Sequence, residues 1–395
     1  MKRREGLTAV LFLATLLAAV LALSAGALDR LCAPPAASAT AVPEGWADSA
    51  ESAVNAMLDQ NHLFIQLYGG VQRLLGRRFM EDADPQYNVY RLSDGTLSFV
   101  NPEPFDPAPR AEALTGLEAA LAERDVPLLY VQAPQKIAPS DDRLPLGVTD
   151  YSNRYADEFL ALLEAAGTDT LDLREALADS GAPWSSLFFR TDHHWNPEGA
   201  FVGWQALAEH LRDSYGLSIP APYTDPDAYT KTVYEDWFLG SQGKRVGALY
   251  AGVDDITLWT PAFETSFTYT APAGRVAREG PLERALLFPE RVAEKDWFEG
   301  NPYTLYAGGD YPTGIMVNRL SPDGPSVVLL RDSYACALTP FLALGCGTLT
   351  TYDLRYWTED DHLMTLLGWA RPDLVIVMYG AGSLRVDSLF RFETP

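Results

Sequence analysis

The chain has 395 residues, of which 47% are hydrophobic and 11% aromatic, and its formal net charge is −23 at pH 7. This length and apolar content allow a full hydrophobic core, which excludes disorder over most of the sequence. The negative charge argues against nucleic acid and anionic lipid surfaces as partners, because both would be repelled. The composition fits a solvated extracellular enzyme or binding protein.

The N-terminus combines a basic start with a long apolar run. The chain opens Met-Lys-Arg-Arg and has no charged residue over 6–28, enough for about 34 Å of helix against a hydrocarbon core of roughly 30 Å. We interpret residues 1–28 as an uncleaved anchor in the cell membrane. A signal peptide cut after the small residues 25–27, which would release a secreted protein, is the alternative. In both cases the rest of the chain is predicted to be extracytoplasmic.

Composition divides the remaining chain into three parts. Residues 29–45 are rich in alanine and proline and predict a tether. A folded domain is expected over 46–395, starting with a helical stretch over 46–79. Within it, residues at about 220–311 are full of aromatic residues, glycine, proline and threonine, with short alternating runs, and predict a β-rich insertion.

Helical and strand-like segments alternate on either side of this insertion. A hairpin over 88–100 is predicted to turn at Asp94-Gly95. Strands separated by helices imply a mainly parallel sheet with helices on both faces, whose ligand sites lie at the carboxyl ends of the strands. The other predicted elements are helices over 110–124, 153–166, 197–215, 334–344 and 363–369, and strands over 128–131, 170–173, 326–331, 348–352 and 374–378.

The most informative segment reads Arg-Thr-Asp-His-His-Trp over 190–195 and precedes a helix start with Asn196 as N-cap. Asp192 and His194 are two positions apart, so an extended or tightly turned backbone places both side chains on one side. The carboxylate can then hold one imidazole nitrogen and leave the other free as a base. The alternative is a pair that only caps and staples the helix start. His193, between them, is expected to point away.

A serine at a second junction is the candidate nucleophile. Ser333 follows the predicted strand over 326–331 and opens a predicted helix, a turn that exposes a hydroxyl beside helix-terminal amides. With His194 as base and Asp192 as its orienting acid, Ser333 would complete a Ser-His-Asp triad. An ordinary N-cap serine is the alternative.

The substrate and oxyanion contacts have several candidates. The amide of Ser333 or Tyr334 is a natural oxyanion donor at such a turn. Trp195 is interpreted first as the packing anchor of its loop and second as a substrate contact. Three further side chains near predicted strand ends are candidates for an additional contact: Arg331, Arg355 and Tyr379.

Other patterns have simpler interpretations. The pair Asp360 and His362 lies at a helix start, where acidic residues are expected anyway. The glycine-rich loop over 240–245 could line the site but lacks the spacing of a phosphate loop. With five histidines in the chain and no second ligand cluster, neither a metal nor a cofactor is expected. Cys336 is predicted to be a small buried residue, and a disulfide between Cys336 and Cys346 is the alternative.

Taken in order, four motifs resemble the DHHW protein family: Thr-Asp-His-His-Trp-Asn, Asp-Ser-Tyr-Ala with a later Pro-Phe, Asp-Leu-Arg-Tyr at 353–356 and Ala-Pro-Gln-Lys-Ile. The family takes its name from the tetrad seen here at 192–195. It is similar in turn to the SGNH-hydrolase-like alginate O-acetylation proteins, whose shorter motif and later serine would fall on Asp192, His194, Trp195 and Ser333. The resemblance implies an SGNH-hydrolase-like α/β domain over 46–395, with a permuted strand order because the acid and histidine precede the serine.

The same resemblance implies a function. We expect an extracytoplasmic serine esterase or O-acetyltransferase that acts on cell-surface polysaccharide through a triad and an acyl-enzyme. A membrane-bound acyltransferase of the MBOAT type is the implied partner. The alternative is a noncatalytic glycan-binding or polysaccharide-assembly protein on the same fold, because fold resemblance alone does not establish an activity.

Overall fold

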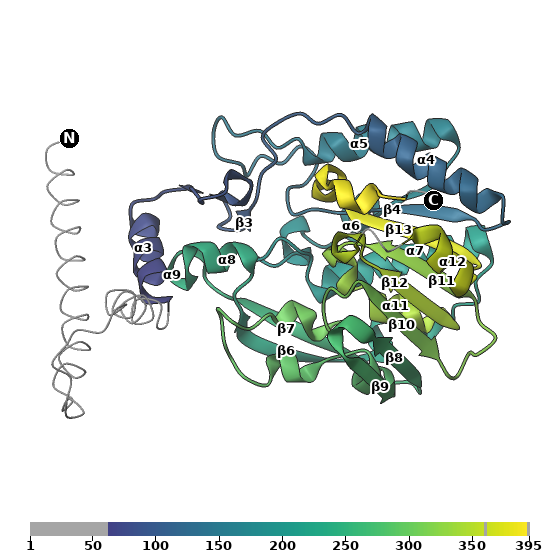
Figure 1. Ribbon diagram of the computed structural model, residues 1–395. Helices are drawn as coiled ribbons and strands as arrows, with labels where there is room; N and C mark the ends of the chain where they lie inside the picture. The colour runs from purple at the N-terminus through teal and green to yellow at the C-terminus, as the bar shows by residue number, and fades with distance from the viewer. Residues whose placement is uncertain (1–61, 359–361, 393–395) are drawn as a thin grey trace, which may run out of the picture.

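The computed structural model describes residues 62–358 and 362–392 (Figure 1). The predicted anchor over 1–28, the tether over 29–45 and Asp360 therefore lie outside the described residues. Within the described part, no helix is both long and apolar enough to cross a membrane.

A mixed sheet of eight strands forms the centre of the molecule (Figure 1). Its first five strands pair in parallel, and the last three continue the sheet in antiparallel pairing. From one edge to the other, the strands are β5 (Asp169–Asp172), β4 (Leu128–Ala133), β13 (Leu374–Gly380), β11 (Ser326–Arg331), β12 (Thr348–Tyr352), β10 (Thr313–Asn318), β8 (Phe267–Ala271) and β9 (Val276–Gly280).

Apolar side chains of the central strands alternate between two buried cores. In β13, Ile376 and Met378 belong to one core, whereas Val377 and Tyr379 belong to the other. Strands buried on both faces read as continuous hydrophobic runs, which is why their sequences show no polar alternation. The first core also contains α6 (Leu173–Asp179), α7 (Pro197–Tyr215) and α11 (Thr339–Leu344), and the second contains α4 (Ala108–Ala122), α5 (Ser152–Ala166) and α12 (Leu363–Ala370).

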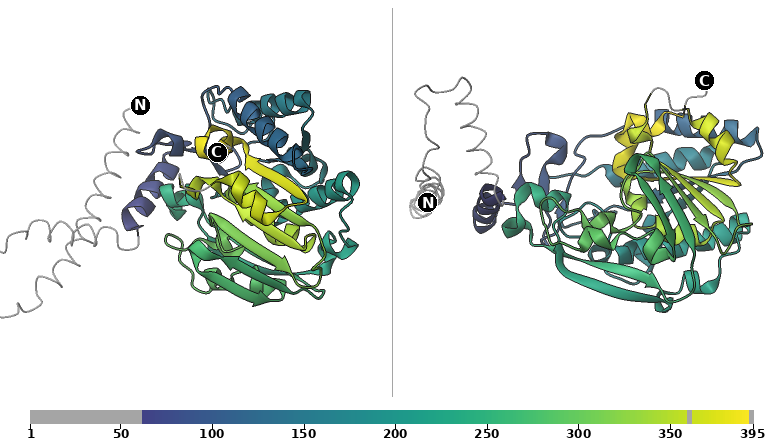
Figure 2. Two further views of the ribbon diagram at one scale, coloured as in Figure 1. Left: turned by 45° about the vertical axis from the view of Figure 1, so that its right-hand side comes forward. Right: turned by 60° about the horizontal axis from the view of Figure 1, so that its bottom comes forward.

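The predicted α/β sheet with helices on both faces is confirmed. The blue helices α4 and α5 lie above the sheet in Figure 1 and in the left view of Figure 2. Helix α7 has the predicted bounds, because both of its ends are encoded locally. The Asn196 side chain accepts a hydrogen bond from the Gly199 amide at 2.9 Å, and Gly216 ends the helix at a φ of 67° that favours glycine.

The predicted helix over 334–344 is wrong as one element. Residues Ser333–Cys336 form a 3-10 turn, and α11 begins only at Thr339. Pro340 lies in the first turn of α11, the position where its missing N–H costs no helical hydrogen bond. Helix α6 and strand β10 were not predicted from the sequence.

The region over 220–311 contributes strands to two sheets. β6 (Tyr229–Phe238) and β7 (Asp254–Pro261) form a separate antiparallel pair, whereas β8 and β9 extend the main sheet. The right view of Figure 2 shows the β6–β7 ribbon along the bottom of the molecule. The short helices of the region over 220–311 are α8 (Ser241–Val246), α9 (Ala248–Ala251) and α10 (Leu282–Ala285).

The N-terminal part of the described chain packs against this region. Helix α3 (Leu63–Leu74) contacts α8 and α9, and a small sheet follows it. The predicted hairpin at Asp94-Gly95 is confirmed as the turn of this small sheet, in which the Asp94 carboxylate accepts from the Thr96 amide at 2.9 Å. The strands of the small sheet are β1 (Phe79–Met80), β2 (Val89–Arg91) and β3 (Leu97–Ser98).

Candidate active site

Ser333 lies where β11 ends, at the carboxyl edge of the parallel strands. It is the first residue of a 3-10 turn, and Asp332 caps that turn by accepting from the Tyr334 amide at 2.9 Å. The second carboxylate oxygen of Asp332 accepts from the Gly380 amide at 2.7 Å and the Ser383 hydroxyl at 2.6 Å. The serine turn is therefore tied to the segment that follows β13.

The structure brings Ser333, His194 and Asp192 together, although the serine lies 139 positions after the histidine. The Ser333 hydroxyl oxygen is 2.8 Å from Nε2 of His194, and Nδ1 of His194 is 2.5 Å from Oδ1 of Asp192. The backbone amide of His194 also donates to Oδ1, at 3.1 Å. This arrangement can pass a proton from the hydroxyl to the imidazole while the carboxylate stabilises the cation that forms.

The Asp192 carboxylate is held on its other side by the glycine-rich loop. The Ser241 amide donates to Oδ2 of Asp192 at 2.6 Å. Gly240 allows this approach, because a Cβ there would lie 2.2 Å from the Cβ of Asp192. Burial alone would raise the pKa of Asp192, but the His194 imidazole and the Ser241 amide hold it well below its usual value.

A second carboxylate fixes the loop that carries the acid and the histidine. Asp254, at the start of β7, accepts from the amides of Arg190 and Thr191 at 2.7 and 2.8 Å and from the Thr191 hydroxyl at 2.6 Å. The Lys136 ammonium donates to the carbonyls of Leu97 and Arg190, which also holds the loop at Arg190. The loop is thus held on both sides before any ligand binds.

Tyr303 contributes to the site without any signal in the sequence. Its ring stacks on the His194 imidazole, with centroids 4.0 Å apart and an interplanar angle of 11°. Its hydroxyl donates to the carbonyls of Ser333 and Tyr334 at 3.1 and 3.0 Å. One buried side chain therefore positions the base and the serine turn at once.

The prediction that His193 points away from the site is wrong. Its half-buried ring lies on the wall of the cleft, 3.8 Å from the His194 ring, and its Nδ1 is 2.8 Å from the Ser241 hydroxyl. Desolvation and the neighbouring His194 lower the pKa of His193 to about 3. The imidazole is therefore neutral at physiological pH. The prediction assumed that neighbouring residues point to opposite sides, as in an extended strand. The backbone turns tightly here instead, and both histidines lie on the same side.

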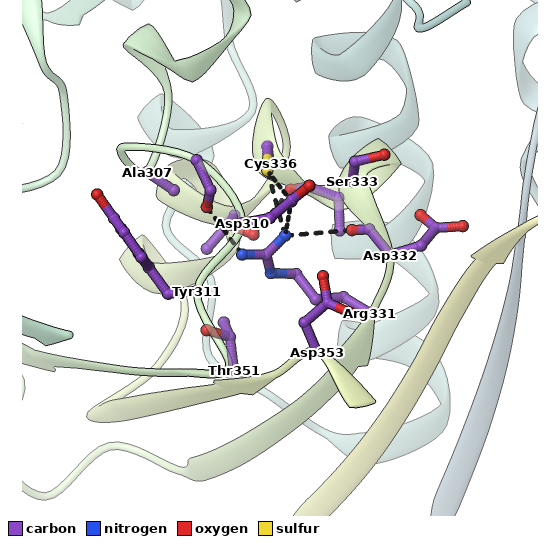
Figure 3. Close-up of polar contacts among 12 residues, drawn as sticks. Ala307, Asp310, Tyr311, Arg331, Asp332, Ser333, Cys336, Thr351 and Asp353 are labelled. Carbon is purple, nitrogen blue, oxygen red and sulfur yellow. Dashed lines mark hydrogen bonds and ion pairs between the residues drawn. The ribbon is translucent and has the colours of Figure 1, made fainter. Parts of the chain in front are cut away.

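Below the serine turn lies a cluster of charged groups (Figure 3). The buried Arg331 guanidinium donates to Asp310 at 2.7 Å and to the Asp332 carbonyl at 3.3 Å. Burial raises the pKa of Asp310, but Arg331 and Arg355 outweigh it and lower the value to about 2. Figure 3 shows the Ser333 side chain pointing away from this cluster, so the predicted substrate or oxyanion contact of Arg331 is not seen.

Three further predicted contacts are also not available in the cleft. Tyr379 is fully buried, and its hydroxyl donates to the Leu389 carbonyl at 2.9 Å, because strand alternation directs this ring into the core that contains α4 and α5. Trp195 is fully buried and donates from its indole N–H to the Tyr334 carbonyl at 2.9 Å, which is the predicted packing role. The Tyr334 amide already donates to Asp332, so it is not available as an oxyanion donor.

Arg355 does lie on the wall of the cleft. Its Nε donates to Asp353 at 2.9 Å, and its Nη2 donates to Asp310 at 3.2 Å. The Ser333 amide occupies the first position of its turn, where no carbonyl of the turn accepts from it. These two donors are the predicted oxyanion contacts that the geometry leaves in reach of the cleft. Tyr334 also lines the cleft, through its side chain.

The cleft above Ser333 has a volume of about 570 Å³. That volume is within the range of about 300–1,000 Å³ that is usual for ligand sites. Asp192, His193 and His194 also have potential metal-ligating atoms within 4.8 Å of one another, yet each side chain is engaged in the hydrogen bonds described above.

Cys336 and Cys346 are both buried free thiols, so the predicted buried role of Cys336 is confirmed and the alternative disulfide is not formed.

Comparison of sequences identifies relatives over the first part of the domain. Residues 100–235 match the family model of the SGNH hydrolase-like domain of the acetyltransferase AlgX. This segment contains Asp192 and His194 and ends before Ser333. The "Probable alginate O-acetylase AlgJ" of Pseudomonas aeruginosa is 34% identical over 133 residues, which are 30% of this chain and 32% of that protein. The match thus spans about a third of the relative's length.

Comparison of structures covers most of the chain. Bacillus cereus PatB1 with a sulfonyl adduct is similar with a TM-score of 0.65 at 21% identity, over 80% of this chain and 99% of that one. A DHHW family protein from Eubacterium siraeum has a TM-score of 0.60 at 16% identity, over 80% and 97% of the two chains. At these identities the likeness concerns the fold. The predicted SGNH-hydrolase-like fold and the predicted resemblance to the DHHW and alginate O-acetylation proteins are confirmed.

Proposed function

We propose that the chain is an extracytoplasmic O-acetyltransferase or esterase of cell-surface polysaccharide, with Ser333 as nucleophile, His194 as base and Asp192 as the orienting acid. The observation that carries the proposal is the pair of contacts at 2.8 and 2.5 Å that joins the three side chains beside an open cleft. The names of the relatives support an acetyl group and a polysaccharide as the reactants.

In the proposed acylation, the Ser333 hydroxyl oxygen attacks the carbonyl carbon of an acetyl ester while Nε2 of His194 takes its proton. The tetrahedral oxyanion is stabilised by the Ser333 amide and the Arg355 guanidinium. As the carbonyl re-forms, the bond to the leaving alcohol breaks, and His194 returns the proton to that alcohol. Asp192, ionised because of its lowered pKa, stabilises the imidazolium in between.

Deacylation reverses the roles with a new acceptor. His194 takes a proton from a sugar hydroxyl or a water molecule, whose oxygen attacks the acetyl-serine. The bond between the acetyl carbon and the Ser333 oxygen then breaks, and His194 returns the proton to that oxygen. A sugar acceptor gives transfer, and water gives hydrolysis. An MBOAT-type membrane acyltransferase is the proposed source of the acetyl group. The proposed single N-terminal anchor would hold the domain outside the cytoplasm, and it lies in residues 1–28, outside the described part of the chain.

The test is intact and peptide mass spectrometry of the full chain after exposure to p-nitrophenyl acetate. We expect an acetyl adduct on the peptide that contains Ser333, and its absence in Ser333→Ala and His194→Ala. Cys336→Ser is the matched control for a second nucleophile, and it should still be acetylated at Ser333. A folded wild-type protein that forms no adduct with any activated acetyl ester would favour the noncatalytic glycan-binding protein instead.

A further inference from the structure

A second hollow continues the cleft above Ser333. It has a volume of about 510 Å³ and extends from the Tyr334 side chain toward the small sheet and the segment after β13. The two hollows share their lining at the junction, so they form one elongated groove with the proposed nucleophile in one half. The shared residues are Tyr87, Phe99, His193, Tyr334, Gly382 and Val386.

Aromatic rings line the junction of the groove in a row. The rings of Tyr87 and Phe99 are 5.8 Å apart, the rings of Phe99 and His193 are 6.0 Å apart, and the His193 and Tyr334 rings are 6.2 Å apart. Tyr87 is exposed, and the Arg245 guanidinium lies 4.0 Å from its ring centroid on one side. Neighbouring rings are tilted or edge to face, with interplanar angles of 65°, 39° and 66°, so they line the junction with apolar carbon in several orientations.

The second hollow adds groups that both donate and accept hydrogen bonds. Asn101 and Gln135 lie in its wall, where each side-chain amide uses an N–H within the protein and keeps further polar capacity. Its exposed charged residues, Glu103 and Arg385, are of opposite sign. A lipid chain would be poorly matched to these amides, whereas pyranose rings present apolar C–H faces and a rim of hydroxyls. His193, neutral because of its lowered pKa, adds a further uncharged polar contact at the junction.

We propose that this second hollow is the binding site for the polysaccharide chain, which lies over Tyr87 and Phe99 and delivers one hydroxyl to the acetyl group on Ser333. The inference rests on the proposed function for the reaction, and it assigns the acceptor to the half of the groove away from Arg355. The acetyl donor then uses the half that contains the triad.

The first experiment measures binding without chemistry. In the full-length Ser333→Ala protein, chitohexaose and an alginate hexasaccharide are titrated by calorimetry, and Tyr87→Ala and Phe99→Ala are added separately. Each ring removed should weaken binding of at least one hexasaccharide by roughly three- to tenfold, the range expected for loss of one stacking contact. Trp369→Ala removes an exposed ring on α12 that lines neither hollow, and it should leave binding unchanged.

The second experiment separates this inference from the proposed reaction. In the protein with an intact Ser333, Tyr87→Ala should raise the KM for the hexasaccharide in acetyl transfer by a larger factor than it lowers the rate of Ser333 acetylation by p-nitrophenyl acetate, because this small ester needs only the half of the groove that contains the triad. Tyr87 is exposed, so this variant tests the groove even where Phe99→Ala impairs folding.

Three outcomes would overturn the assignment: no binding of either hexasaccharide, binding unaffected by both substitutions, or a fall in the Ser333 acetylation rate of Tyr87→Ala as large as its rise in KM. Tyr87-dependent glycan binding in a wild-type protein that never becomes acetylated would instead overturn the proposed reaction and leave the glycan site standing.

Discussion

Two clusters of charged and polar groups adjoin the Ser333 turn and differ in what they can do. Asp192 and His194 face the open cleft and contact the serine hydroxyl through a single line of hydrogen bonds. In the second cluster, the buried Arg331 guanidinium pairs with Asp310 and also donates to the Asp332 carbonyl of the turn. In the first cluster, Nε2 of His194 can accept the proton of the Ser333 hydroxyl, whereas the second cluster is the ion pair of Arg331 and Asp310.

The two clusters serve different requirements of the same short turn, namely proton transfer and structural support. A proton-transfer group needs a partner whose charge can change, and a supporting group needs a charge that does not. The pKa of Arg331 is raised well above its usual value: burial would lower it, but the Asp310 carboxylate more than compensates. We therefore expect substitutions in the first cluster to reduce rate and substitutions in the second to reduce stability.

The largest expected effect is on rate, in Asp192→Asn. An asparagine keeps the shape but removes the charge that stabilises the imidazolium and sets the histidine tautomer, so acetylation of Ser333 by p-nitrophenyl acetate should fall by roughly 10³- to 10⁴-fold. Stopped-flow release of p-nitrophenol measures this rate. A loss of less than tenfold would mean that the carboxylate is only structural.

The next effect is on stability, in Arg331→Met. This substitution leaves the Asp310 carboxylate and the Gly309 and Asp332 carbonyls without their buried donor, and breaking such a pair costs about 3–5 kcal/mol of unfolding free energy. Urea unfolding followed by tryptophan fluorescence measures it. Ser333→Ala, one residue past Asp332, is the control and should change stability by less than about 1 kcal/mol. Equal stabilities for the two variants would contradict the division between the clusters.

Acid unfolding should sharpen the same comparison. The pKa of Asp310 is lowered to about 2 from its usual 3.8, so the folded state binds fewer protons than the unfolded state between these values. The corresponding stability is present above pH 4 and is lost as the pH falls toward 2, a contribution of roughly 2 kcal/mol. Asp310→Asn should flatten this part of the stability profile, whereas the exposed Asp323→Asn should not. An unchanged slope in Asp310→Asn would place the acid sensitivity elsewhere.

The sequence predicted elements whose ends are encoded locally. Helix α7 has an asparagine N-cap, a proline at its first position and a glycine at its end, so its bounds follow from neighbouring residues. The break before α11 was missed because the apolar run around Cys336 fits a helix, and only the position of Pro340 indicates that the α-helix starts later.

The site residues that the sequence predicted are those whose residue type and position relative to a predicted element or to each other both indicate catalysis. Ser333 at a strand end and the Asp192–His194 spacing each carry a local signal, and the fold brings them into contact. Tyr303, in the 3-10 helix Pro302–Leu305, carries none, because it acts through a ring stack with His194, 109 positions earlier in the chain. Tyr379 was misplaced because the sequence does not state which face of a strand buried on both sides a residue occupies.

Tyr303 contacts both the His194 imidazole and the backbone of the serine turn, so it offers the finest test of the comparison. Tyr303→Phe keeps the ring on His194 and removes the hydroxyl that donates to two carbonyls of the serine turn. We expect a stability loss of about 1 kcal/mol and a fall in acetylation rate of less than about tenfold. Tyr303→Leu, which also removes the ring, should lower the rate further, because the imidazole then loses its packing surface as well. Should Tyr303→Phe instead reduce the rate as much as Tyr303→Leu, the serine turn rather than the position of the base would limit the reaction.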